Sequence, residues 1–91
     1  MRYKIIPTTQ FKKDIKHIEK RGYNIDEIRR VITILANGEQ LDKKYKDHIL
    51  KGKYVEYREC HIEPDWLLIY KVDNEQLILM LTRTGTHNDL F

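Results

Sequence analysis

Trp66-Leu67-Leu68-Ile69-Tyr70 is the stretch that decides the fold, because it is apolar over nearly its whole length. A short run of this kind is typical of a central β-strand buried on both faces. Glu63-Pro64-Asp65 precedes it and Asp73-Asn74-Glu75 follows Val72, so turn-forming residues bound it on both sides. We therefore place a central strand at residues 66–72.

Further strands are expected at residues 3–6, 54–62 and 76–83. The short connections on either side of the central strand imply antiparallel neighbours. Pro7 ends the first strand, since its missing N–H would interrupt a central ladder.

Two amphipathic helices are expected between the first strand and the others. Thr8 and Thr9 are candidate N-caps of the first helix, which Gly22 ends. Asn24 and Glu27 resemble a capping box for the second. The apolar stripes consist of Phe11, Ile15 and Ile18, and of Ile28, Val31, Ile32 and Leu35. The order β-α-α-β-β-β predicts an α+β fold, with two helices packed on a small, mainly antiparallel sheet.

Residues 39–53 show no clear period, and we expect a long surface connection there. A solvated charge run is one interpretation, and a functional loop is the other, because connections this long in a small domain are often functional. Lys46 and Lys51 are the candidates for RNA contacts, and His48 lies between them.

Length and composition limit the possible classes of protein. The 91 residues fit one domain, 1–91, and 41% hydrophobic with 34% charged residues is typical of a globular chain. No apolar run reaches the ~20 residues that span a bilayer, and the lone Cys60 favours a reducing compartment, so we expect a cytoplasmic protein with no membrane contact. A net charge of +3 favours a polyanionic partner, such as RNA or an acidic protein segment.

Three of the four histidines, His48, His61 and His87, lie in the second half of the chain, whereas His17 lies on the expected exposed side of the first helix. Imidazole can both accept and donate protons near neutral pH. Any one of these residues alone is most simply a surface polar group, but three from separate segments could converge on one site.

Carboxylate and guanidinium groups are expected beside these histidines. Strand alternation puts Glu59 and His61 on one face, while Asp65 and Arg83 lie at strand ends. Such a set suits RNA transesterification, with a base, an acid and a cation for the phosphate. No His-x3-His or Cys-x2-Cys spacing is present, so we expect no metal and no cofactor.

Three other residues have a structural and a chemical interpretation. Trp66 is expected in the core rather than as a platform for a base. Cys60, with the opposite parity to His61, is expected as a packing residue rather than a nucleophile. Phe91 is either a frayed end or an aromatic side chain that stacks on a base.

Several segments closely resemble the YafQ branch of the RelE/ParE toxin superfamily. The resemblance is dense over residues 45–91 and weaker before them, where it rests mainly on the β-α-α order. The segments are Tyr45-Lys46-Asp47-His48, Tyr57-Arg58-Glu59-Cys60-His61-Ile62-Glu63-Pro64-Asp65-Trp66, Leu68-Ile69-Tyr70-Lys71, Arg83-Thr84-Gly85-Thr86-His87 and Leu90-Phe91.

The resemblance implies a RelE-like fold and a ribosome-dependent mRNA endonuclease that cuts the codon in the A site. It also implies a cognate DinJ/RelB-like antitoxin, whose complex with the toxin binds operator DNA. By position, the family's catalytic residues match His48, His61, Asp65 and His87, its phosphate-binding arginine matches Arg83, and its terminal aromatic matches Phe91. The family usually has aspartate before an Ala-His pair, where this chain has Glu59 before Cys60-His61, which leaves the role of that carboxylate open.

Two alternatives belong to other functional classes. One is a non-catalytic ParE-like toxin that grips a protein target such as gyrase, and the other is an inactive partner of an antitoxin in DNA autoregulation. The set of histidines argues against the first, because a pure binding module needs no groups that titrate near neutrality.

Overall fold

The computed structural model describes residues 1–52 and 56–91. A five-stranded sheet has the order β1-β5-β4-β3-β2, in which β1 runs parallel to β5 and the other neighbours are antiparallel. The elements are β1 (Lys4–Pro7), α1 (Thr9–Lys20), α2 (Ile25–Ala36), the short 3-10 helix η1 (Lys43–Tyr45), β2 (His48–Ile49), β3 (Arg58–Glu63), β4 (Trp66–Asp73), β5 (Ile78–Gly85) and α3 (His87–Leu90). The expected α+β fold is confirmed.

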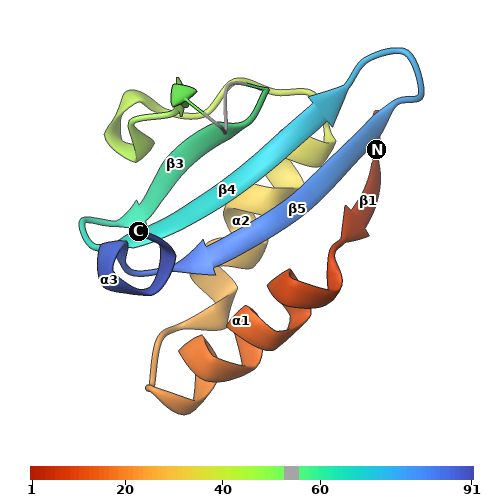
Figure 1. The fold of residues 1–91 in the computed structure, drawn as a ribbon. Helices are drawn as coiled ribbons and strands as arrows, with labels where there is room; N and C mark the ends of the chain where they lie inside the picture. Colours follow the sequence, from red (N-terminus) through yellow and green to blue (C-terminus); the bar gives the residue numbers. More distant parts are fainter. Residues whose placement is uncertain (53–55) are drawn as a thin grey trace.

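The two long helices lie on the same side of the sheet (Figure 1). Their apolar residues Phe11, Ile18 and Val31 pack with alternate residues of the strands, such as Leu68 and Leu79, in one core cluster. This alternation follows from the period of two in a strand. Leu67 and Ile69 have the opposite parity and are also buried, so the second face of β4 is covered too.

The N-terminus of α1 continues the edge of the sheet after β1 ends. The Thr8 N–H donates to Leu81 O at 2.9 Å, and its hydroxyl donates to Thr82 O at 2.8 Å. One turn into the helix, the Asp14 carboxylate accepts the N–H of Thr84 at 3.1 Å. The backbone of β5 beyond its pairing with β1 is therefore bonded by the helix rather than by a strand.

Both helix N-caps follow the sequence, with one difference in detail. The Thr8 hydroxyl accepts the Phe11 N–H at 3.0 Å, as a side-chain cap does. The Asn24 side chain caps α2 by accepting the N–H of Asp26, rather than that of Glu27 as in the expected capping box.

Three boundaries were predicted wrongly. The connection over residues 39–53 holds η1 and β2 in its described part, to residue 52. The strand expected at residues 54–62 corresponds to β3, which begins at Arg58. Tyr54 and Val55 lie outside the described residues. The last strand starts at Ile78, because the Asp73 carboxylate accepts the backbone N–H of Gln76 and Leu77 has a positive φ of 55°, which keeps both in a turn.

The C-terminal helix α3 was not predicted. Thr86 is its N-cap and forms a capping box with Asp89. Within the described residues, no helix is long and apolar enough to cross a bilayer.

Candidate active site

Three of the histidines form a row across one end of the sheet. The ring centroids of His48 and His61 are 6.4 Å apart, and those of His61 and His87 are 6.2 Å apart. Phe91 continues the row, 6.3 Å from His87. We call His48, His61, His87 and Phe91 the histidine row. The residues come from β2, β3 and the segment 87–91, so the expected convergence of three histidines is present.

Glu59 lies beneath this row. Its side chain is 7% exposed, and its Oε1 lies 3.5 Å from His48 Nε2 and 3.9 Å from His61 Nε2. The pairing of β2 with β3 places His48 directly opposite Glu59, and directly opposite residues share a face. One carboxylate thus serves two imidazoles. This glutamate side chain reaches both rings.

The second ring nitrogen of His48 also faces an acceptor. Its Nδ1 lies 2.7 Å from the carbonyl oxygen of Lys46, which has a left-handed φ of 50°. Both ring nitrogens of His48 therefore face oxygen atoms, Nδ1 the carbonyl of Lys46 and Nε2 the carboxylate of Glu59.

His87 has a different surrounding. Its Nδ1 and its backbone N–H both approach Asp65 Oδ1, at 3.0 and 3.2 Å. These two hydrogen bonds from His87 lower the pKa of Asp65, which stays a carboxylate and therefore accepts a hydrogen bond from Nδ1–H. The opposite nitrogen, Nε2, then carries the lone pair. His87 is thus oriented as a proton acceptor by the acidic residue that the sequence singled out.

Arg83 is held at the edge of β5 by α1. Its Nε and Nη2 donate to Asp14 at 2.8 and 3.2 Å, and the Asp14 side chain is 8% exposed. The register aligns Arg83 with Ile69 and Glu59, so its Cβ starts on the face that carries Glu59. Two hydrogen bonds join this guanidinium to Asp14, a partner that the sequence did not predict.

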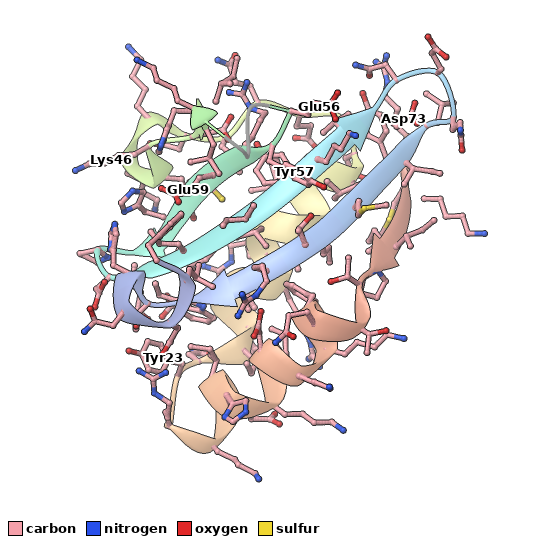
Figure 2. The ribbon with its side chains drawn as sticks, viewed as in Figure 1. Tyr23, Lys46, Glu56, Tyr57, Glu59 and Asp73 are labelled. Carbon is pink, nitrogen blue, oxygen red and sulfur yellow. The ribbon has the colours of Figure 1, made fainter. Side chains whose placement is uncertain are left out.

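The two lysines proposed for RNA contacts are both exposed. Lys46 follows η1 and points outward beside β3, on the same side as Glu59 (Figure 2). Lys51 follows the short strand β2. Within the described residues neither lysine forms an ion pair.

A second group missed by the sequence analysis fixes the strand that bears His48. Asp47 accepts hydrogen bonds from Arg58 Nη2 at 2.9 Å and Nε at 3.2 Å, and from the hydroxyl of the buried Tyr70. These contacts raise the pKa of Arg58, mainly through the hydrogen bond to Asp47. They join residues 11 and 23 positions apart, so no local pattern reveals them.

The two residues expected in the core are there. Trp66 is fully buried, donates from Nε1 to Thr84 Oγ1 at 2.9 Å and packs edge-on against Tyr23. Cys60 is also fully buried, and burial raises the pKa of its thiol well above the ordinary range. A thiol in this state is a poor nucleophile.

His87 and Phe91, the last members of the histidine row, lie in a C-terminal segment that is fixed by contacts on two sides. Arg21, at the end of α1, pairs with Asp89 at 2.8 Å, and the same Asp89 oxygen accepts the Thr86 N–H at 2.9 Å. A Cβ on Gly85 would lie 2.9 Å from the Cβ of Asp89, so a larger residue at 85 would push α3 away. His87 is therefore positioned by Asp65 on one side and by Arg21, through Asp89, on the other.

A hollow of about 540 Å³ lies beside the row, lined by Tyr45, Lys46, His61 and Glu63 among others. Within the described residues, no three His, Cys, Asp or Glu side chains are arranged to hold a metal ion.

Sequence and fold comparisons define the class of protein. Residues 3–91 match the family described as "Bacterial toxin of type II toxin-antitoxin system, YafQ". The mRNA interferase toxin YafQ of Escherichia coli strain K12 is 42% identical over 83 residues, which cover 90% of this chain and 88% of that protein. A small α+β toxin of a type II toxin–antitoxin system is thus the class that the fold and the site define.

Solved structures agree. The E. coli DinJ–YafQ complex contains a chain with a TM-score of 0.90 and 40% identity, covering 98% of both chains. A structure described as a metal-bound toxin from Helicobacter pylori has a TM-score of 0.92 and 39% identity, covering 98% of this chain and 99% of that one. The chain belongs to the YafQ toxin family.

Proposed function

We propose that this toxin is an endoribonuclease that cuts mRNA in the A site of the ribosome by acid–base transesterification, with no metal ion in the reaction. The 2′-oxygen attacks the adjacent phosphorus while a base removes its proton. The bond to the 5′-oxygen breaks, and an acid protonates that oxygen. The products are a 2′,3′-cyclic phosphate and a 5′-hydroxyl.

The observation that carries this proposal is the contact of His87 Nδ1 with Asp65 Oδ1 at 3.0 Å. It fixes the tautomer in which Nε2 accepts a proton, so His87 is the base. His48 is the acid, because acceptors face both of its nitrogens. His61 lies between them and shares the carboxylate of Glu59 with His48.

The remaining candidate residues bind the substrate. Arg83, Lys46 and Lys51 contact phosphates, and the exposed Phe91 stacks on a base next to the cleaved bond. Asp14 holds Arg83 by two hydrogen bonds, so that guanidinium has one fixed orientation. A fixed cation stabilises charge on a phosphate oxygen at little cost in reorganisation.

The ribosome supplies the orientation that a domain of this size cannot impose on a flexible strand. Such orientation is worth on the order of 7–11 kcal/mol in favourable cases. The toxin acts in the cytoplasm and is held inactive by a cognate DinJ-like antitoxin, in a complex that binds operator DNA. The similar E. coli toxin in complex with DinJ supports this partner.

His87→Ala is the test of the mechanism. Single-turnover cleavage of ribosome-bound message should fall by about 10²–10⁴-fold with ribosome affinity and melting temperature unchanged, because only proton transfer is lost. His17→Ala, on the exposed side of α1, is the matched control and should have the wild-type rate. Unchanged cleavage by the His87 variant would remove the base from the mechanism.

Mapping of mRNA 5′ ends in a translation reaction tests the activity itself. New ends within A-site codons, with naked message left nearly intact, are the expected result. Translation arrest without new ends would instead show a binding toxin that acts on a protein target. Metal analysis of the active protein completes the test, since one tightly held metal per chain whose removal stops cleavage on intact ribosomes would contradict metal-free chemistry.

A further inference from the structure

The exposed face of α1 carries four lysines: Lys12, Lys13, Lys16 and Lys20. At about 100° per residue they fall within an arc of roughly 100°. Phe11 and Ile18, which face the core, lie on the other side of the helix. We call these four residues the lysine face.

The lysine face is unpaired, whereas the nearby charges are matched. Arg21 pairs with Asp89, and Asp14 pairs with Arg83. Within residues 1–52 and 56–91 none of the four lysines forms an ion pair or hydrogen bond through its side chain. Four lysines against Asp14 and Glu19 give α1 a formal charge of +2, within the +3 of the whole chain. The lysine face is therefore a local positive surface on this helix.

The chemistry of this face favours a phosphate backbone over a protein. Lysine is depleted in protein–protein interfaces, which are built around aromatic and other large apolar anchors. The exposed large hydrophobic residues of the described chain are Met1, Ile49, Leu77 and Phe91, and none lies on α1. Exposed lysines without apolar anchors are suited to sequence-independent contacts with phosphates.

The lysine face also leads toward the histidine row. Arg21 follows Lys20 directly and is bonded to Asp89 of α3, the helix that begins with His87. Lys12, Lys16 and Lys20 succeed one another by about 6 Å along the helix axis. A polyanion bound along α1 would therefore fix where the row lies.

We propose that the lysine face binds the phosphate backbone of ribosomal RNA and so sets the position of the toxin on the ribosome, apart from the message in the site. This rests on the proposed function, which makes the ribosome the place of action. The contacts add to binding and leave the proton transfers unchanged. The lysine face should therefore determine affinity and its dependence on salt, but not the cleavage rate at saturation.

A triple variant with a matched control tests this proposal. The test variant is Lys12→Gln, Lys16→Gln and Lys20→Gln, which keeps good helix formers at all three positions. The control, Lys4→Gln, Arg29→Gln and Lys43→Gln, removes the same charge from exposed positions on β1, α2 and η1. Co-sedimentation with vacant bacterial ribosomes and with purified 16S ribosomal RNA, over a series of KCl concentrations, gives the affinities.

The α1 variant should bind both probes about tenfold or more weakly than the wild type, and its plot of log affinity against log salt should be shallower by about 2. The control should stay close to the wild type. Both variants should cut ribosome-bound message at the wild-type rate when the toxin is saturating, with unchanged melting temperatures.

Three results would overturn the proposal. They are wild-type ribosome affinity in the α1 variant, an equal loss in both variants, and loss of binding to the cognate antitoxin with ribosome affinity intact. If the wild-type protein binds ribosomes without cutting message, only the proposed function is contradicted, and the comparison of the α1 variant with its control variant still tests this inference. A wild-type protein that binds neither probe removes both.

Discussion

The two buried carboxylates, Glu59 and Asp14, bind different partners at the two sides of the sheet. Glu59 lies under two imidazoles, with its Oε1 3.5 Å from His48 Nε2 and 3.9 Å from His61 Nε2. Asp14 accepts hydrogen bonds from Gln10, Arg83 and the backbone of Thr84, and so joins α1 to β5. The first carboxylate faces the histidine row, and the second fixes the position of a cation.

Asp14→Asn should destabilise the protein and weaken substrate binding. The amide keeps an oxygen for one donor but leaves the guanidinium of Arg83 without its charged partner. We expect a loss of about 2 kcal/mol, below the value for a fully buried pair because Arg83 is 29% exposed. Urea denaturation measures this loss, and a raised KM for ribosome-bound message, with a smaller change in kcat, measures the release of Arg83.

Asp26→Asn is the matched control for that substitution. Asp26 pairs with Arg29 at 3.6 Å on the surface of α2, with both side chains at least 75% exposed. Such a pair contributes little, so the change in stability should stay below about 0.5 kcal/mol. Equal effects at the two positions would mean that the contact between Asp14 and Arg83 has no special weight.

At the scale of elements, α3 depends on two carboxylates. Asp65 accepts the N–H of His87, and Asp89 accepts the N–H of Thr86 together with the guanidinium of Arg21. These contacts lower the pKa of both groups, for Asp65 chiefly through His87 and for Asp89 chiefly through the Thr86 N–H. The helix has four residues, so it owes its position to these contacts rather than to its own stability.

The docking of α3 should therefore fail in acid. A carboxyl whose pKa is lower in the folded state stabilises that state fully above its ordinary pKa, and the contribution is lost as the pH falls through the lower folded value. Contacts between α3 and the side chain of Arg21, seen as nuclear Overhauser effects, should persist from pH 7 to about 5 and be lost only below the ordinary carboxyl range near 3.9. NMR titration measures this.

Asp89→Asn should weaken the same contacts already at neutral pH, because the bond with Arg21 loses its charge and the capping box weakens. Contacts within α1, which do not involve these carboxylates, provide the reference signal. Loss of the contacts between α3 and Arg21 near pH 6 in the wild type would instead show that a histidine controls the docking.

The elements that the sequence analysis missed are the short ones. The long strands and both helices follow from apolar periodicity, which needs several residues to be visible. β2 has two residues and exists because Asp47 is bonded to Arg58 and Tyr70, which are far along the chain. In contrast, α3 has a local signal in Thr86 and Asp89, a capping-box spacing that could have been read.

The histidines of the candidate site could be predicted, but their roles could not. Residue type and strand parity grouped Glu59 with His61, and the structure confirms that they share a face. His48 differs from His87 in its contacts. His48 faces the carbonyl oxygen of Lys46, which has a left-handed backbone conformation. His87 faces Asp65, which lies in the turn between β3 and β4. Arg83 was expected beside the imidazoles because the sequence places it at the end of the last strand. The sequence does not reveal that α1 lies at the same edge of the sheet, where Asp14 binds Arg83.

At the scale of the whole molecule, Cys60 reports on global unfolding. It is fully buried on the helix side of β3, and burial raises the pKa of its thiol. In the native state it should react with a disulfide reagent far more slowly than a free thiol, and the rate should rise with urea in parallel with the fraction unfolded. A rapid reaction without denaturant would indicate local opening of β3, as would a rate independent of urea.

The parallel pairing of β1 with β5 joins Lys4 to Ile78, the first strand made to the last. During vectorial synthesis the nascent chain exposes β1, α1 and α2 long before their partner strand emerges, so the sheet cannot close until β5 has left the exit tunnel. His87 emerges later still, after the strand that anchors it. The histidine row therefore assembles only after β5 and residues 87–91 have been synthesised, although half of the fold precedes them in the chain.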